Sequence, residues 1–189
     1  MLAQMTYRLH QKITFQDAIE VILDDAIALH GAECGNIQLP IRDELAIVAH
    51  RGLSAEFLAA FRRVKKEDDC ACGRAFRIRD SVVIRDVSRD SGFADFRINV
   101  ERAGFRSVQS TPLFTQVGAL LGVVSTHFVN VHEPTPIEMK TLKEYGMFAA
   151  EYLEKLAGDV PLETKAEEMS AGLYTHGLAC RDFRKALQA

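Results

Sequence analysis

The sequence lacks the features that mark membrane, secreted and nucleic-acid-binding proteins. No apolar run reaches the roughly 18 residues that cross a bilayer. The N-terminus has neither the apolar core nor the small-residue cleavage site of a secretory signal. A formal net charge of −3 provides no global positive field for a polyphosphate backbone. We therefore expect a cytoplasmic protein that binds neither membranes nor nucleic acids.

Motifs for common catalytic chemistry are also missing. The sequence contains neither GxGxxG nor a P-loop, and it has no Gly-x-Ser-x-Gly nucleophile elbow. Its four cysteines, Cys34, Cys70, Cys72 and Cys180, do not have the C-x₂₋₄-C spacing of structural zinc sites. We expect reduced thiols and no metal site.

The composition is that of a globular protein with one main domain. Of 189 residues, 48% are hydrophobic and 26% are charged, and a chain of this length buries roughly 70% of its unfolded surface. Residues 1–11 are expected to be an N-terminal lead-in and residues 12–157 one α+β domain. Residues 158–189 are expected to be a polar C-terminal tail whose sequence is compatible with helix.

Two long helices are predicted at the ends of this domain. Thr14 provides an N-cap, and apolar residues then recur at helical spacing until Gly31. Thr135, Pro136 and Glu138 combine an N-cap, a proline at the first helical position and a capping-box glutamate. Shorter helices are predicted after Ser54 and, with Asp69 as cap, over residues 70–77.

Segments with strand character lie between the two long helices. Residues 34–39 and 44–51 are separated by a short polar turn and predict a hairpin, as do residues 106–115 and 118–128. A further strand is predicted over residues 81–85. We expect a central sheet of about six strands that is at least partly antiparallel.

The order and spacing of several segments resemble those of a GAF domain over roughly residues 12–157. The segments that carry the resemblance are Gly35-Asn36-Ile37-Gln38-Leu39, Leu45 to Gly52, Ala71-Cys72-Gly73-Arg74-Ala75, Asp86-Val87 with Phe93, Ala103-Gly104-Phe105-Arg106-Ser107, Ser110-Thr111-Pro112-Leu113 and Leu121-Gly122-Val123-Val124-Ser125.

This resemblance implies an antiparallel sheet with the terminal helices packed together on one face. Short helices and loops would enclose a small-molecule pocket on the other face. Such domains act mostly as sensory or regulatory modules without catalysis, and many dimerise through their terminal helices. A separate signalling protein would then receive the output. The sequence identifies neither the ligand nor a cofactor.

Strand alternation predicts which side chains line that pocket. Polar residues on the proposed strands, and a positive charge at the start of one, are suited to hydrogen-bond or pair with a ligand. Each has a competing structural interpretation, in which His127 is a satisfied core histidine and Arg106 forms a surface ion pair. The predicted ligand-binding residues are Asn36, Gln38, Cys70, Cys72, Arg106, Gln109, Ser125 and His127.

Cys70 and Cys72 are the most reactive groups that the sequence suggests. At the start of a helix the macrodipole favours thiolate, whereas neighbouring Asp68 and Asp69 oppose it. Residues two apart on a helix point about 200° away from each other, so a disulfide is not expected. One enzymatic branch of the GAF family, the free methionine-(R)-sulfoxide reductases, carries a cysteine at the position of Cys72. Residues 86–108 lack the second cysteine that this branch would carry, so such an enzyme is the alternative function.

Overall fold

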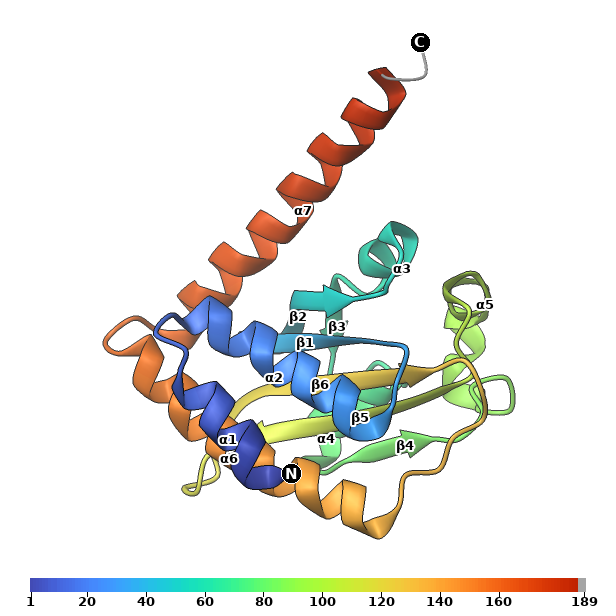
Figure 1. The fold of residues 1–189 in the computed structure, drawn as a ribbon. Helices are drawn as coiled ribbons and strands as arrows, with labels where there is room; N and C mark the ends of the chain where they lie inside the picture. The colour runs from blue at the N-terminus through green and yellow to red at the C-terminus, as the bar shows by residue number, and fades with distance from the viewer. Residues whose placement is uncertain (187–189) are drawn as a thin grey trace.

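The computed structural model describes residues 1–186, with side chains up to Tyr174. Seven α-helices, a 3₁₀ helix and six strands form the described chain (Figure 1). In chain order they are α1 (Leu2–His10), α2 (Phe15–His30), β1 (Cys34–Ile41), β2 (Glu44–Arg51), α3 (Ala55–Ala60), β3 (Arg63–Lys65), α4 (Ala71–Ile78), β4 (Val82–Ile84), η1 (Ser91–Phe96), α5 (Arg97–Ala103), β5 (Ser107–Phe114), β6 (Leu120–Phe128), α6 (Pro136–Ala157) and α7 (Leu162–Ala186).

The six strands form one sheet in the order β3-β2-β1-β6-β5-β4, and all neighbouring strands are antiparallel. This confirms the predicted α+β fold and both hairpins. Strand β3 was not predicted, because its three residues are too few for alternation to be recognised. It pairs with residues 44–46 of β2 at one edge of the sheet.

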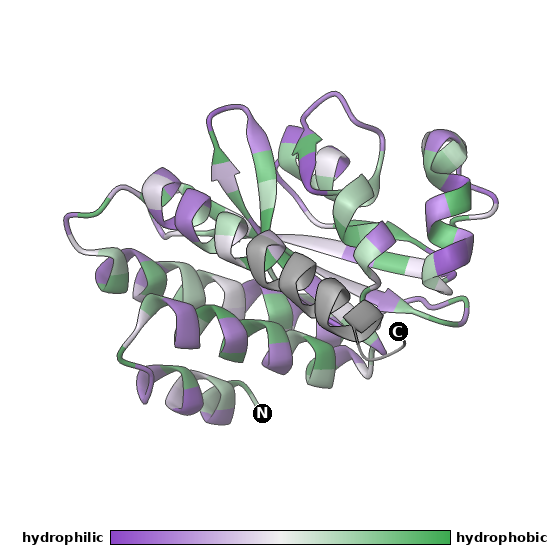
Figure 2. Cartoon of the chain, turned by 90° about the horizontal axis from the view of Figure 1, so that it is seen from above, coloured by the Kyte–Doolittle hydropathy of each residue, from purple (hydrophilic) through white to green (hydrophobic). Residues whose placement is uncertain are grey.

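Side-chain caps set the beginnings of the long helices as predicted. The Thr14 hydroxyl accepts a hydrogen bond from the Asp17 N–H, and Gly31 ends α2 at φ 59°. At the start of α6, Thr135 and Glu138 form a complete capping box, with Pro136 at the first helical position between them. Figure 2 shows that hydrophobic and hydrophilic residues recur along the helices, as amphipathic packing requires.

Helices α2 and α6 cover one face of the sheet, α1 packs on these two helices, and together they build the larger core. Ile37 and Leu39 of β1 point into it, as their alternation predicted. A buried ionic contact also joins the three helices. The carboxylate of Asp25 on α2 pairs with Arg8 of α1 at 2.9 Å and accepts a hydrogen bond from the Tyr145 hydroxyl of α6 at 2.8 Å. Burial nevertheless raises the pKa of Asp25.

Helices α1 and α7 both pack on the domain between them. The expected lead-in contains α1, whose Met5 and Leu9 are buried in the larger core. The expected tail forms α7, whose first turns pack on the same core through Leu162, Ala166 and Met169. Leu173, one turn further on, instead contacts the second core on the opposite face. Helix α7 therefore contacts the hydrophobic cores on both faces of the sheet.

In the described part of the chain, no helix combines the length and the apolar character that crossing a membrane requires.

Candidate functional site

A small hollow lies on the face of the sheet opposite the terminal helices. Its volume is about 20 Å³, which is close to the space of one water molecule. Strands β1 and β6, helix α4 and several aromatic rings surround it. The residues that line it are Asn36, Gln38, Phe57, Phe61, Cys70, Ala71, Cys72, Phe93, Phe105, Val108, Ser125 and His127. Six of the eight predicted site residues therefore meet at one place.

Antiparallel pairing explains how residues distant in sequence converge. Asn36 of β1 lies directly opposite Ser125 of β6, and Cys34 lies opposite His127. Residues two apart on a strand share a face, so Gln38 and His127 extend the same polar row. The Ser125 hydroxyl is already hydrogen-bonded to the Ser110 hydroxyl at 2.8 Å.

Several polar atoms around the hollow are buried without a hydrogen bond. Asn36 Oδ1, both amide atoms of Gln38 and His127 Nδ1 have no partner among the residues that the structure describes. All three side chains are at most 3% exposed. Leaving such a group unpaired costs about 1–3 kcal/mol. The arrangement therefore provides donors and acceptors for a molecule that occupies the hollow.

His127 is held by aromatic rings. Phe57 and Phe105 approach its imidazole edge to face, with ring centroids 5.5 and 4.6 Å away. Burial lowers the pKa of His127 to about 3, so the imidazole is neutral near pH 7. The imidazole therefore supplies no positive charge to the hollow at that pH.

The two cysteines at the start of α4 are in contact, contrary to the prediction that they point apart. The helix begins at Ala71, and Cys70 is its N-cap with an extended backbone (φ −68°, ψ 163°). This conformation turns the Cys70 side chain back over the first turn, and the two sulfur atoms lie 3.5 Å apart. Asp69 does not cap the helix as predicted but pairs with Arg77.

This contact separates the acidities of the two thiols. A hydrogen bond from Cys72 lowers the pKa of Cys70, and the Gly73 N–H acts in the same direction. The same contact, together with burial, raises the pKa of Cys72. Of the two sulfur atoms, Cys70 is therefore the one that more readily carries negative charge.

Two predicted site residues lie elsewhere. Gln109 is buried under the terminal helices, because the register of β5 on β6 sets Ser110 opposite Ser125 and Gln109 opposite Thr126. Thr126 in turn contacts His30 of α2 at 3.0 Å. Arg106 is half exposed and pairs with Asp86 at 2.5 Å. The prediction that these residues share the hollow is therefore wrong, and the surface ion pair considered for Arg106 is correct.

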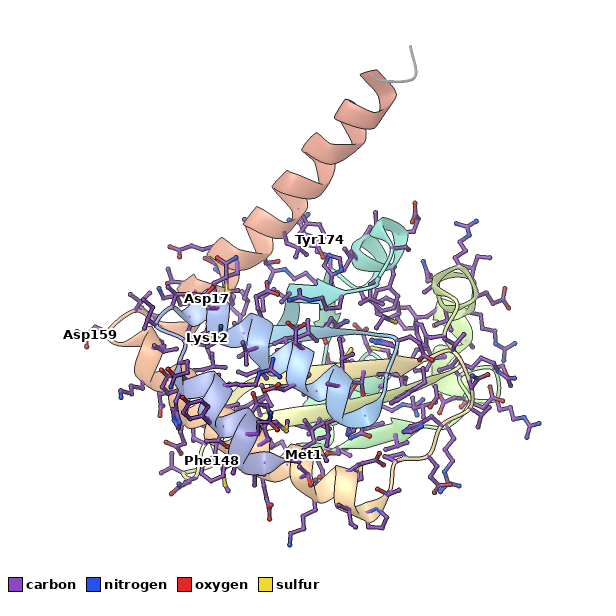
Figure 3. The ribbon with its side chains drawn as sticks, in the orientation of Figure 1. Met1, Lys12, Asp17, Phe148, Asp159 and Tyr174 are labelled. Atoms are coloured by element: carbon purple, nitrogen blue, oxygen red, sulfur yellow. The ribbon has the colours of Figure 1, made fainter. Side chains whose placement is uncertain are left out.

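Aromatic side chains from α3 and η1 close the hollow. Phe57 and Phe61 stack with centroids 4.5 Å apart, and Phe61 contacts Phe96 at 4.9 Å. Arg74 of α4 fastens η1 by pairing with both carboxylate oxygens of Asp90, at 2.9 and 2.5 Å. Helix α3 is held differently: its Leu58 carbonyl accepts a hydrogen bond from the Tyr174 hydroxyl of α7 at 2.8 Å. Figure 3 shows Tyr174 where α7 passes α3.

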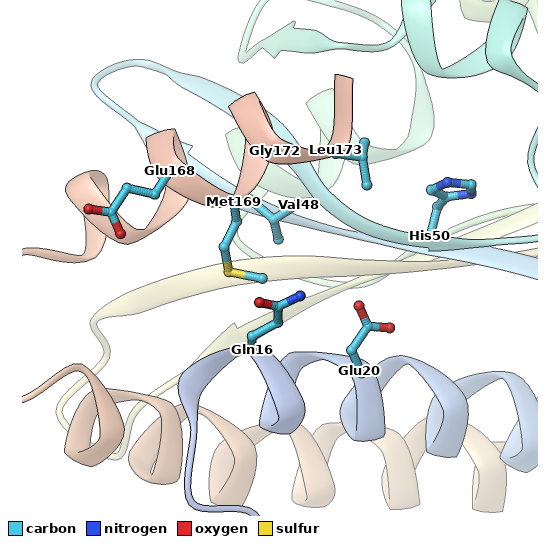
Figure 4. A pocket seen from close by; sticks show the side chains of 8 residues that line it. All are labelled: Gln16, Glu20, Val48, His50, Glu168, Met169, Gly172 and Leu173. Atoms are coloured by element: carbon cyan, nitrogen blue, oxygen red, sulfur yellow. The ribbon is translucent and has the colours of Figure 1, made fainter. Parts of the chain in front are cut away.

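A second, larger hollow of about 580 Å³ lies between α7 and the body of the domain (Figure 4). Its walls are Gln16 and Glu20 of α2, Val48 and His50 of β2, and Glu168, Met169, Gly172 and Leu173 of α7. Glu20, its charged group on α2, is paired with Arg51. Sequence reasoning missed this groove because it treated α7 as a tail, although Leu162, Ala166, Met169 and Leu173 recur at helical spacing.

Comparison with known proteins agrees with this architecture. The GAF domain model matches residues 12–154. The GAF domain of a phosphoenolpyruvate-protein phosphotransferase from Coxiella burnetii superposes with a TM-score of 0.70 at 15% identity, covering 82% of this chain and 90% of that one. A domain of a two-component sensor histidine kinase protein from Sinorhizobium meliloti gives 0.62 at 16% identity, covering 76% and 92%.

A free methionine-R-sulfoxide reductase from Neisseria meningitidis, solved with its substrate, gives a TM-score of 0.64 at 18% identity and covers 84% of this chain and 89% of that one. At these identities the likeness concerns the fold alone. A search of curated proteins found no match. The matched family model spans most of the chain, from residue 12 to residue 154 near the end of α6. The chain therefore belongs to the GAF domain family.

Proposed function

We propose that this GAF domain is a sensory module in which a small neutral molecule binds in the hollow beside Asn36, Gln38 and His127. The observation that carries the proposal is the set of buried polar atoms that have no partner among the described residues. A ligand with both donors and acceptors would satisfy them and recover the free energy that their burial costs. Binding would then be reported to a separate output protein.

The lining of the hollow favours a neutral ligand. Among the described residues, no arginine, lysine, aspartate or glutamate lines it, and His127 is neutral at pH 7. A charged ligand would lose its hydration there without a compensating counter-ion. Small amides, ureas and polyols have the required chemistry, because they combine donors and acceptors without a net charge.

The size of the hollow implies that binding moves its cover. A molecule larger than one water exceeds the volume of about 20 Å³, so it must displace α3 or η1. Tyr174 of α7 donates a hydrogen bond to α3, and the Arg62 guanidinium lies 4.4 Å from the centroid of its ring. Displacement of α3 would therefore change the contacts of α7. We propose this connection as the route from the ligand to the output helix.

A binding experiment with matched variants tests the proposal. Thermal shift and calorimetry with a panel of neutral amides and polyols, and with carboxylates of similar size, would compare the wild type with Gln38→Leu and Gln109→Leu. We expect at least one neutral probe to raise the Tm of the wild type. Gln38→Leu should abolish that shift, whereas Gln109→Leu, on the opposite face, should retain it.

Three results would contradict the proposal. The first is that no neutral probe binds. The second is that carboxylates alone bind. The third is that Gln38→Leu and Gln109→Leu weaken binding equally, which would mean that the effect is one of general stability.

The alternative reductase function is supported by the thiols in the hollow and by the reductase among the structural neighbours. It is less well supported than sensing, because the pKa of Cys72, the cysteine it would use, is raised by burial and by Cys70. Incubation of the pure protein with free methionine sulfoxide and dithiothreitol tests it. Reduction that Cys72→Ser abolishes would establish the enzyme, and its absence would eliminate it.

A further inference from the structure

We propose that Cys70 and Cys72 form a peroxide-reactive dithiol, which hydrogen peroxide converts to a disulfide at the start of α4. The proposal stands on the contact between the two sulfur atoms at 3.5 Å and on their position in the wall of a hollow lined by unpartnered polar groups of the described chain. It does not rest on the proposed sensory ligand, because the reacting groups are the thiols themselves.

The backbone permits the disulfide. A bond between residues two apart would distort a regular helix, but Cys70 is the N-cap and already has extended φ and ψ angles. The sulfur atoms need only approach from 3.5 Å to the bond length of about 2.05 Å. Gly73 holds this first turn close to the preceding loop, since a Cβ there would lie 2.2 Å from the Asp68 carbonyl oxygen.

The surroundings activate Cys70 in particular. Its sulfur accepts a hydrogen bond from Cys72, which lowers its pKa more than burial raises it, and a second from the Gly73 N–H at the helix N-terminus. The Asp68 carboxylate raises this pKa to a smaller extent. The positive charge of Arg74 also acts on Cys70. By contrast, burial raises the pKa of Cys34 to about 11, so Cys34 in the same chain is an internal unreactive reference.

The size and polarity of the hollow select the oxidant. The volume of about 20 Å³ is close to the space of one water molecule. Hydrogen peroxide is the smallest peroxide and has both donors and acceptors, so it requires the least displacement of α3 or η1. The amide of Gln38 and Nδ1 of His127 face the same space without partners among the described residues. Bulky alkyl hydroperoxides require a larger displacement of these elements.

The chemistry balances in two steps. The Cys70 thiolate attacks one peroxide oxygen, the O–O bond breaks, and the departing hydroxide takes up a proton and leaves as water. The Cys72 sulfur then attacks the Cys70 sulfenic acid. An S–S bond forms, the S–O bond breaks, and the hydroxyl leaves as a second water with the Cys72 proton. Two thiols lose two electrons in total, and the peroxide gains them.

The test is mass spectrometry of the reduced 189-residue chain after treatment with increasing concentrations of hydrogen peroxide, with the remaining free thiols then alkylated. Trypsin releases residues 67–74, which contain both cysteines. We expect this peptide to lose the mass of two hydrogens and escape alkylation at least about tenfold faster than Cys34 is modified. Cumene hydroperoxide at the same concentration should react more slowly.

Variants separate the two roles. Cys72→Ser should stop at a Cys70 sulfenic acid that dimedone traps, whereas Cys70→Ser should leave Cys72 reduced. Cys34→Ser is the matched control and should form the disulfide as the wild type does. The proposal is overturned if residues 67–74 stay reduced, if Cys70 pairs with another cysteine, or if Cys34 oxidises equally fast. If Cys70→Ser fails to fold, dimedone labelling of Cys70 in Cys72→Ser still tests the proposal.

Discussion

At the scale of single residues, the unpartnered polar side chains of the hollow lower the stability of the fold and offer hydrogen bonds to a ligand. Gln38 is 1% exposed, and neither atom of its amide has a partner in the described chain. The side chain of Gln109 is equally buried, but its Nε2 donates to Thr111 Oγ1 at 3.1 Å, so only its Oε1 has no partner in the described chain. The same residue type thus has a different energetic role on each face of the sheet.

This difference predicts that replacing glutamine by leucine has opposite effects on stability at the two positions. Gln38→Leu removes unpaired polar atoms and should raise the free energy of unfolding by about 1 kcal/mol, whereas Gln109→Leu breaks a hydrogen bond and should lower it by about the same amount. Urea denaturation of both variants measures these values. Destabilisation by Gln38→Leu would mean that its amide is satisfied in solution.

Two buried histidines predict loss of stability in acid. The folded-state pKa values of His30 and His127 are lowered to about 4 and about 3, mainly by burial. The unfolded chain therefore binds more protons between pH 6.5 and these values, so stability is fully present above pH 6.5 and falls as the pH decreases. Each histidine contributes a slope of up to about 1.4 kcal/mol per pH unit.

His127→Phe should remove one of these two contributions and reduce the slope between pH 6 and pH 4. Denaturation midpoints measured across that range test it. An unchanged slope would show that His127 is protonated in the folded state.

Sequence reasoning identified most of the hollow because β1 and β6 alternate between polar and apolar residues. It placed Gln109 on the wrong face of the sheet. The alternation along β5 shows which of its residues share a face, but only the register of β5 on β6 shows whether that face is covered by the helices or lines the hollow. The contact between Cys70 and Cys72 was missed because Asp69, not Cys70, was taken as the cap of α4.

At the scale of elements, capping residues predicted where α2, α3 and α6 begin. Strand β3 and the packing of α1 and α7 were not predicted, because each depends on tertiary contacts with distant parts of the chain. Local patterns carry little information about such contacts.

The junction of α1, α2 and α6 depends on the buried Asp25 carboxylate. Tyr145→Phe removes its 2.8 Å hydrogen bond and should cost about 1.5–3 kcal/mol, since the acceptor is a buried charged group. Tyr152→Phe is a control, because its hydroxyl donates to the backbone carbonyl of Lys12 near the surface. Chemical denaturation compares the two variants. An equal cost would argue against a special role for Asp25.

At the scale of the whole molecule, the core residues of α2 and α6 are used within one chain. Phe15, Ile19, Leu142 and Tyr145 are buried against the sheet, so they do not remain available for a second copy. The outer surfaces of α1 and α6 carry other hydrophobic side chains: Tyr7 is 67% exposed and Phe148 is 43% exposed. We propose that a homodimer would form through this surface.

Phe148→Glu should therefore weaken the dimer at least about tenfold by placing a charge in its apolar contact. Val117→Glu is the matched control, because Val117 is 89% exposed on the β5–β6 turn. Sedimentation velocity over a range of concentrations measures both. A wild type that stays monomeric, or equal effects of the two variants, would refute dimerisation through α1 and α6.

The most direct measurement of the central claim is hydrogen exchange with and without the neutral probe that shifts the Tm. If occupancy of the hollow is transmitted through α3 to α7, protection should change in residues 55–60 and 162–174 of the wild type and remain constant in Gln38→Leu. Changes that persist in Gln38→Leu, or that are confined to the groove beside Gln16 and Glu168, would contradict the account.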